Sequence, residues 1–343
     1  MKTQLRDKTL QELTELVRGM RFPAFRAKQL YGWIYKGKTS FREMNNLPEV
    51  FIQKLEEECE LDPLVKIREQ RSALDGTRKF LFGLPDGNAV ESVFLQYKYG
   101  NSVCISSQAG CRMGCSFCAS GIDGLVRDLT AGEMISQIMD IERETGDKVN
   151  HIVVMGTGEP FDNYENLSRF LRIIHDPKGF GLSMRNITVS TCGLIPKIRQ
   201  FTDDFPQVNL AISLHAADDS LRSSLMPVNR AYPLADVLEA AFEHAERTGR
   251  RVTFEYALIR GVNDRDADAE RLAEIMGGRL CHINLIPLNE VTETGYASAG
   301  TTRAARFQKI LEERKIPATI RRQMGADIDG ACGQLRLNNQ KSH

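Results

Sequence analysis

The sequence has no excess of charge, no long apolar run and a single tryptophan. Lys and Arg balance Asp and Glu at 45 each in 343 residues, so the chain lacks the strongly basic composition of many nucleic-acid-binding domains. No stretch approaches the roughly 18 to 20 consecutive apolar residues that span a bilayer. The N-terminus also lacks the apolar core of a signal peptide. These absences predict a cytosolic protein with no membrane partner.

Cysteines are scarce and unevenly placed. In a cytosolic protein they indicate metal binding or catalysis more often than a disulfide framework. Four of the eight fall within 15 residues: Cys104, Cys111, Cys115 and Cys118. The other four stand far apart in the sequence: Cys59, Cys192, Cys281 and Cys332.

Positive charge is concentrated at the start of the chain. Residues 1–50 hold ten Lys and Arg against five Asp and Glu, a net charge of +5. From charge alone, a solvated helical face explains such a pattern better than an RNA-binding surface does. Charge alone therefore does not establish an RNA partner.

The pattern of apolar residues divides the chain into three regions. Residues 1–65 show helical spacing at Leu10, Leu13, Leu16 and Val17 and predict a small helical accessory domain. Residues 66–98 predict a β extension, because two apolar runs flank the hairpin-turn dipeptide Asp86-Gly87. Residues 99–343 form the main domain.

The main domain alternates strand-like and helix-like segments, which predicts an α/β fold of parallel βαβ units. Six or seven units indicate a full or partial (β/α) barrel, and an open doubly wound sheet is the alternative. The strand-like runs are Val103–Ser106, Ile152–Met155, Ile187–Ser190, Val208–Leu214, Val252–Ile259, Ile283–Leu288 and Ala318–Arg321. In a barrel, the functional residues would lie at the C-terminal ends of these strands.

The most informative motif is Cys111-Arg-Met-Gly-Cys115-Ser-Phe-Cys118, with the spacing C-x3-C-x2-C. Three thiolates on one short loop can bind one face of a four-iron cluster and leave the fourth iron open to a small molecule. Gly110 and Gly114 would allow the backbone to curl around the cluster. A closed zinc site is the rival, but it normally uses four ligands in paired spacing.

This motif, with Phe117 before its last cysteine, resembles the radical S-adenosylmethionine (SAM) superfamily, and the whole chain resembles the RlmN/Cfr family of adenosine methyltransferases, RlmN best. The resemblance includes Cys104-Ile-Ser-Ser-Gln-Ala-Gly-Cys111, Met155-Gly-Thr-Gly-Glu-Pro160, Ser213-Leu-His215, Ile283-Asn-Leu-Ile-Pro-Leu-Asn289 and Asp327-Ile-Asp-Gly-Ala-Cys332-Gly-Gln-Leu335. Relatives often carry Met at the position of Thr157.

The resemblance implies a partial (β/α) barrel of radical SAM type, with a [4Fe-4S] cluster and SAM as cofactors. Its cluster ligands would be Cys111, Cys115 and Cys118. It assigns SAM contacts to Gly158, Glu159, Ser190, Ser213, Leu214, His215 and Asn289. Judged singly, these polar residues are more often caps or satisfied loop groups.

The resemblance also implies a reaction. Cys332 would carry a methyl group, Glu91 would take the ring proton, and Cys104 would release the product by forming a disulfide with Cys332. Judged alone, Cys332 would be a small buried apolar residue, Cys104 a core strand residue or a fourth cluster ligand, and Glu91 a solvent-facing strand residue.

The implied substrates are adenosines in 23S rRNA, in the peptidyl-transferase region, and in tRNA, next to the anticodon. An electron donor would be a further partner, and we expect a monomer. Three alternatives stay open: a Cfr-type enzyme that methylates C8 instead of C2, a radical SAM enzyme acting on a protein or small molecule, and a protein that merely binds iron–sulfur or zinc.

Overall fold

A computed structural model of the chain describes residues 2–61, 64–289, 292–328 and 334–335. Its central feature is a ten-stranded sheet with the order β14-β13-β12-β11-β10-β9-β6-β5-β4-β3. The strands are β3 (Val65–Arg71), β4 (Arg78–Gly83), β5 (Ala89–Tyr97), β6 (Gly100–Ile105), β9 (His151–Val154), β10 (Ile187–Thr191), β11 (Asn209–Ser213), β12 (Val252–Leu258), β13 (Cys281–Pro287) and β14 (Ala318–Ile320).

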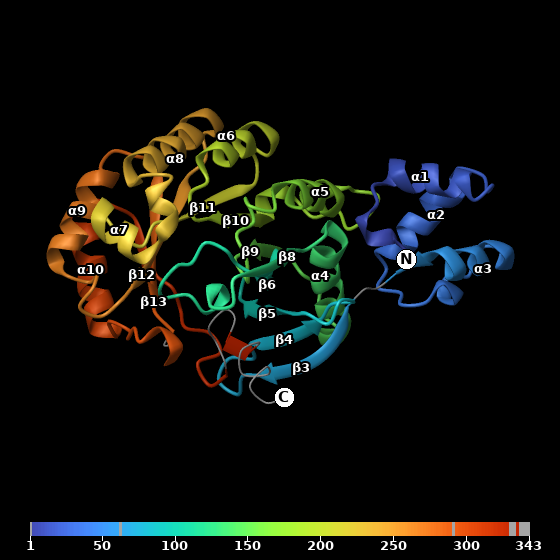
Figure 1. Cartoon of the computed structure of the whole chain (residues 1–343), viewed down its shortest axis with the longest axis horizontal. Coiled ribbons are helices and arrows are strands. Elements are labelled where there is room, and N and C mark those ends of the chain that lie inside the picture. The colour runs from blue at the N-terminus through green and yellow to red at the C-terminus, as the bar shows by residue number, and fades with distance from the viewer. Residues whose placement is uncertain (1, 62–63, 290–291, 329–333, 336–343) are drawn as a thin grey trace.

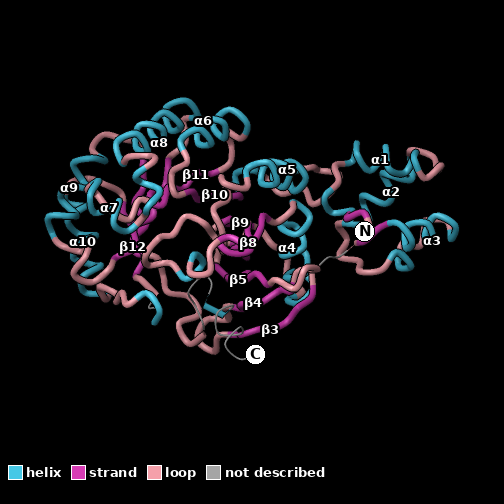
Figure 2. Tube along the Cα trace, in the orientation of Figure 1, coloured by secondary structure: helices cyan, strands magenta, loops and turns pink. Residues whose placement is uncertain are grey.

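Strands β6 and β9 to β14 pair with one another in parallel, and they follow one another in space as they do in sequence. In a doubly wound sheet, the order of the strands along the sheet reverses at an internal strand. The order here does not reverse, so it confirms the partial barrel. Figures 1 and 2 show the helices lying along the outside of the curved sheet. They are α4 (Ala131–Thr145), α5 (Tyr164–His175), α6 (Ile195–Asp204), α7 (Asp219–Leu225), α8 (Leu234–Thr248), α9 (Asp266–Met276) and α10 (Thr301–Glu313).

The β extension is continuous with the barrel. Strands β3, β4, β5 and β6 pair antiparallel in succession, and Val93 of β5 lies opposite Cys104 of β6. The turn between β4 and β5 contains Gly87 with φ of +86°, a conformation that favours glycine, as the Asp-Gly dipeptide predicts. The extension therefore adds a wall to the barrel sheet instead of forming a separate sheet.

The N-terminal helices α1 (Leu10–Gly19), α2 (Phe25–Ile34) and α3 (Glu49–Glu58) lie at one end of the molecule, beside α4 and α5 (Figure 1). A fully buried Arg6 joins them to α4: its Nη1 donates to Ser136 Oγ (2.9 Å) and lies 3.6 Å from Asp140 Oδ1. Asp7 Oδ1 accepts from the backbone N–H of Gly132 (2.6 Å). The accessory region is thus seated on the barrel, and its boundary at residue 65 stays a prediction.

Helix α4 begins with a capping box, in which Thr130 Oγ1 accepts from Glu133 N and the Glu133 carboxylate accepts from Thr130 N. Among the described helices, none is long and apolar enough to cross a membrane.

Gly132 should be intolerant of substitution because the N-terminal segment approaches it closely. An added Cβ would lie 2.9 Å from the Asp7 backbone nitrogen and 3.1 Å from the Arg6 carbonyl carbon. We expect Gly132→Ala to lower the free energy of unfolding by about 1–3 kcal/mol, the usual cost of overpacking, in a urea titration.

Gly32→Ala is the matched control. It is also helical, and its added Cβ has no neighbour within 4 Å. Its stability should stay equal or rise by up to about 1 kcal/mol, from helix propensity. Equal stability of the two variants would show that the contact at Gly132 can open without cost.

Candidate active site

The C-terminal ends of the parallel strands open into one cavity of about 330 Å³. Its wall contains nearly every residue that the sequence predicts for the site, brought together from the ends of five strands and the intervening loops. These are Cys104, Cys111, Cys115, Cys118, Gly158, Glu159, Ser190, Ser213, His215 and Asn289. The candidate site therefore lies at the C-terminal ends of the strands, as predicted for a barrel.

The three-cysteine loop folds back on itself through glycine. Gly110 has φ of +78°, and a Cβ there would lie 2.0 Å from the carbonyl oxygen of Gly124. This close approach permits the hydrogen bond from Cys111 N to Gly124 O (2.9 Å). Gly114, between the first two cysteines, also has a positive φ of +66°. The curled backbone predicted for these two glycines is thus present.

The thiols of the loop lie close enough to affect one another. Burial, together with the charge of the neighbouring Cys118 thiolate, raises the pKa of Cys111 to about 12. Burial and both neighbouring thiolates likewise raise the pKa of Cys115. Three thiolates therefore need a strongly cationic partner to persist here.

A multi-iron cluster fits this loop better than a single ion does. Among the described residues, no three His, Cys, Asp or Glu side chains converge as the ligands of one metal ion. A cluster presents several separate iron atoms, so its three thiolates need not meet at a point. Cys111, Cys115 and Cys118 are the residues that would hold it.

The loop after β9 is held against the cysteine loop by Gln108, which is fully buried. Its Oε1 accepts from Glu159 N (2.8 Å). Gly158, with φ of +112°, lies so near that an added Cβ would be 2.7 Å from Gln108 Cβ. Glycine is therefore required here by both conformation and space.

Glu159 places a buried carboxylate beside the cluster loop. Its two oxygens accept from the backbone N–H groups of Phe161 (3.0 Å) and Cys192 (2.8 Å), which fix its orientation. Burial raises its pKa, and these hydrogen bonds oppose that effect. Such a carboxylate can hold an ammonium group in the cavity, the role that the resemblance implies for the amino group of SAM.

Arg222 of α7 links the ends of β10 and β11 through hydrogen bonds. Its fully buried guanidinium donates to the carbonyl oxygens of Cys192 (2.7 Å), Ser213 (3.2 Å) and Leu214 (3.2 Å). Its Nη1 donates to Asn229 Oδ1 (2.6 Å). The segments after β10 and β11 are thereby fixed relative to each other.

His215 lies in the left-handed region with φ of +56°, which is uncommon outside glycine. Its Nδ1 accepts from Ala257 N (3.0 Å), and its ring makes an edge contact with Phe117 (centroids 4.9 Å apart). Burial, and then the charge of Arg222, lower the pKa of His215 to about 3. The ring is thus a neutral wall of the cavity, with Ser190 and Ser213 (Oγ to Oγ 3.5 Å) beside it.

Two of the predicted site residues that the structure describes do not line the cavity. Leu214 is a fully buried core side chain that does not line the cavity. Glu91 does not line the cavity; it is buried, with Lys79 Nζ 3.0 Å from its Oε2, so it does not face solvent. Cys332 lies outside the described residues.

Sequence reasoning missed several polar residues of the cavity. Glu255 of β12 lines it, is buried, and accepts from Asn284 Nδ2 (2.8 Å); burial raises its pKa. The one sign of Glu255 in the sequence is a carboxylate inside an otherwise apolar strand. Arg321 and Arg322, directly after β14, also line the cavity, but nothing in their spacing indicated it.

The chain that leads toward Cys332 is tied to the β extension. Asp327 accepts from Ser72 Oγ (2.5 Å) and from Ala73 N (2.8 Å). Gly325 N donates to Asp75 Oδ2 (2.9 Å). The turn between β3 and β4 therefore holds residues 325–327 beside the extension.

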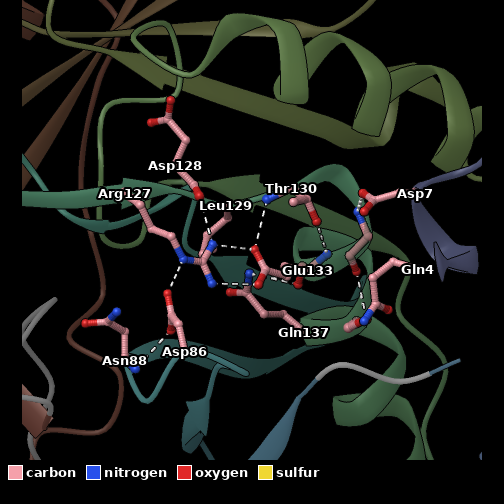
Figure 3. A network of polar contacts seen from close by, with 12 residues as sticks. Gln4, Asp7, Asp86, Asn88, Arg127, Asp128, Leu129, Thr130, Glu133 and Gln137 are labelled. Atoms are coloured by element: carbon pink, nitrogen blue, oxygen red, sulfur yellow. Dashed lines mark hydrogen bonds and ion pairs between the residues drawn. The ribbon is translucent and has the colours of Figure 1, made fainter. Parts of the chain in front are cut away.

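A second ionic network supports the far side of the cysteine loop (Figure 3). Arg127 of β8 (Leu125–Asp128) donates to both carboxylate oxygens of Glu133 (2.8 Å each) and also to Asp86. This fork joins the strand after the cysteine loop to the start of α4 and to the β4–β5 turn.

The depressed pKa of His215 predicts a pH dependence of stability. The unfolded chain takes up a proton near pH 6.5 and the folded chain only near pH 3, so the unfolded state binds more protons in between. Stability is therefore lost as the pH falls from about 6.5 toward 3. We expect His215→Asn, which tolerates a positive φ, to show a smaller difference in Tm between pH 7.5 and pH 5.5 than the wild type.

Ser213→Ala changes the same wall without removing a titratable group, and it should keep the wild-type difference in Tm. If His215→Asn keeps it too, the histidine is accessible to protons in the folded state.

Comparisons with known proteins show the family to which the chain belongs. The radical SAM superfamily matches residues 105–273, and the family described as the ribosomal RNA large subunit methyltransferase N-terminal domain matches residues 3–61. The probable dual-specificity RNA methyltransferase RlmN of Thermoanaerobacter sp. is 48% identical over 334 residues, 97% of each chain. That of Lachnospira eligens is 49% identical over 335 residues, 97% of this chain and 96% of the other.

A crystal structure of a radical SAM methyltransferase from Sphaerobacter thermophilus is 45% identical, with a TM-score of 0.93 over 97% of this chain and 98% of that one. Radical SAM methyltransferases use a [4Fe-4S] cluster and SAM. The chain belongs to the RlmN family of radical SAM RNA methyltransferases.

Proposed function

We propose that the protein methylates carbon 2 of an adenine in RNA, through a methyl group carried on a cysteine of its own chain. The observation that carries this proposal is the single cavity in which the three-cysteine loop, the Gly158–Glu159 loop and Cys104 meet. C2 lies between two ring nitrogens and is electron-poor, so it does not attack an electrophilic methyl group. The bound cluster and SAM supply the radical chemistry that this carbon requires.

In this reaction the thiolate of Cys332 takes a methyl group by displacement and then holds it for attachment to the base. Glu91 accepts the proton that leaves C2. Cys104 attacks the sulfur of Cys332; the new S–S bond forms as the S–C bond breaks, and the carbon leaves with the electron pair and is protonated to a methyl group. Both thiols end as a disulfide, so an electron donor must reduce it before the next turnover.

The placement of Cys104 suits this role. Its side chain is buried at 6% exposure yet lines the cavity, so it can react with a partner there while water is largely excluded. Its neighbours on the cavity wall are apolar residues of β5, Val93 and Leu95. Residues 325–327, tied to the extension, bring the chain to within a few residues of Cys332.

We propose that residues 1–65 form the RNA-binding domain and that the substrates are 23S rRNA and tRNA. Phe25 is 53% exposed, and the guanidinium of Arg26 lies 4.7 Å above its ring. Lys36 Nζ lies 4.3 Å above the ring of Trp33. Aromatic rings beside cations are suited to contact with bases and phosphates. Because such substrates are cytoplasmic, we place the enzyme in the cytoplasm. We also expect it to act as a monomer.

The first prediction concerns the methyl carrier. After anaerobic reconstitution of the cluster and incubation with SAM, mass spectrometry should find one added methylene on the peptide that contains Cys332. Cys332→Ala should lose both this mass and all RNA methylation. Cys59→Ala, a buried cysteine of the accessory region, should keep both; an unmodified Cys332 peptide in active wild-type protein would refute the carrier.

The second prediction concerns the position on the base. RNA treated with the enzyme, digested to nucleosides and analysed by mass spectrometry against standards, should contain 2-methyladenosine. A product of 8-methyladenosine would instead assign the Cfr-type reaction. RNA without any methylated adenine, with Cys332 methylated, would favour a protein or small-molecule substrate.

A further inference from the structure

A buried ion pair lies on the same side of the sheet as Cys104. In the antiparallel register, Lys79 of β4 lies opposite Val93 of β5, and Val93 lies opposite Cys104 of β6. Residues opposite each other share a face, as do residues two apart along a strand. Glu91, two residues before Val93, therefore shares this face with both Lys79 and Cys104.

The two charges meet away from water. Lys79 Nζ lies 3.0 Å from Glu91 Oε2, and the side chains are 1% and 4% exposed. Lysine and glutamate are almost never buried so fully unless they are paired. A buried pair of this kind is often no more stabilising than apolar residues of similar size. Stability alone is thus a weak explanation for two charges in a wall that also contains Leu81, Val93 and Leu95.

A second cation, Arg127, contacts the β4–β5 turn through Asp86. Arg127 is held by both oxygens of Glu133 and by Asp86 (Figure 3). The backbone of Glu91 is also fixed, because Ser106 Oγ donates to its carbonyl oxygen (2.7 Å). The Glu91 carboxylate therefore extends from a fixed strand and forms an ion pair with Lys79.

We propose that Lys79 is a positioning residue for the removal of the adenine C2 proton: its ammonium group holds the buried carboxylate of Glu91 in the orientation in which it acts as the base. This inference rests on the proposed function. In the step concerned, the C2–H bond breaks, its electron pair stays with the ring, and the proton moves to a Glu91 oxygen. Without the ammonium group of Lys79, the carboxylate would lose the contact that orients it.

The adenine is joined covalently to the protein before this proton leaves, so a defect in Glu91 has a distinctive signature. The methyl carbon is by then bonded both to Cys332 and to the ring, so stalled enzyme should accumulate as a covalent protein–RNA adduct. A merely structural role for Lys79 would lower cluster content or methylation of Cys332 and would not favour this adduct.

The test uses full-length, cluster-reconstituted Lys79→Met and Lys79→Arg, with SAM, reductant and substrate RNA. We expect Lys79→Met to keep the cluster absorption and the Cys332 methylation of the wild type. Methylated RNA should form at least about 100-fold more slowly, the usual range for loss of general-base function, while the adduct accumulates on denaturing gels. Lys79→Arg, which retains the charge, should recover most of the rate.

Glu91→Gln run in parallel separates this inference from the function on which it rests. If Glu91→Gln releases product normally, the assignment of the base fails, and Lys79 has no base to position. If Glu91→Gln traps the adduct but Lys79→Met turns over like the wild type, only the role of Lys79 is refuted. Should Lys79→Met fail to fold, Lys79→Gln replaces it: adduct accumulation supports the inference, and wild-type turnover overturns it.

Discussion

A buried guanidinium group must find acceptors for its N–H groups, and Arg222 meets this requirement at the edge of the barrel. Its partners are the carbonyl oxygens of Cys192, Ser213 and Leu214 and the amide oxygen of Asn229. Cys192 in turn donates its N–H to Glu159. Arg222 thus connects the ends of β10 and β11, Glu159 extends the connection to the loop after β9, and the shape of the cavity depends on these contacts. Leaving such a charge unpaired in the interior would be far more costly than these bonds are stabilising.

Much of the barrel and the core of the site could be predicted from the sequence, because they depend on local patterns. Apolar runs separated by amphipathic helices indicate the parallel strands, and close spacing places the three cysteines on one loop. The glycines at 110 and 158 mark backbone that approaches other backbone or Gln108. The roles of Glu91, Cys104 and Cys332, by contrast, came only from resemblance to a family, since each has an ordinary explanation on its own.

What could not be predicted depends on partners distant in the chain. Arg222 binds a carbonyl thirty residues away, and Asp327 binds a serine 255 residues away. The spacing of Lys79 and Glu91 in the sequence does not predict their contact, because only the strand register puts them on one face. Leu214 was predicted as part of a cofactor motif, yet its side chain belongs to the core. In each case the three-dimensional neighbours decide the role of the residue.

The β extension changes the character of the site. A parallel barrel edge alone presents loops, whereas β4 and β5 add a rigid antiparallel wall that continues the sheet beyond β6. This wall carries Glu91, holds the C-terminal segment through Ser72, Ala73 and Asp75, and lines the cavity with Val93 and Leu95. The loops proposed to bind the cofactors and the strand that carries Glu91, the proposed general base, thus belong to different parts of one sheet.

The seat of the accessory helices on α4 has a consequence for building chimeric enzymes. Arg6 is buried against Ser136 and Asp140, and Gly132 leaves no room for a larger residue beneath Asp7. A module transplanted from a relative would therefore dock only if it brought an arginine and an aspartate to these two positions. Its recipient would in turn need the glycine and the acid of α4, so the two halves of this contact can be exchanged only together.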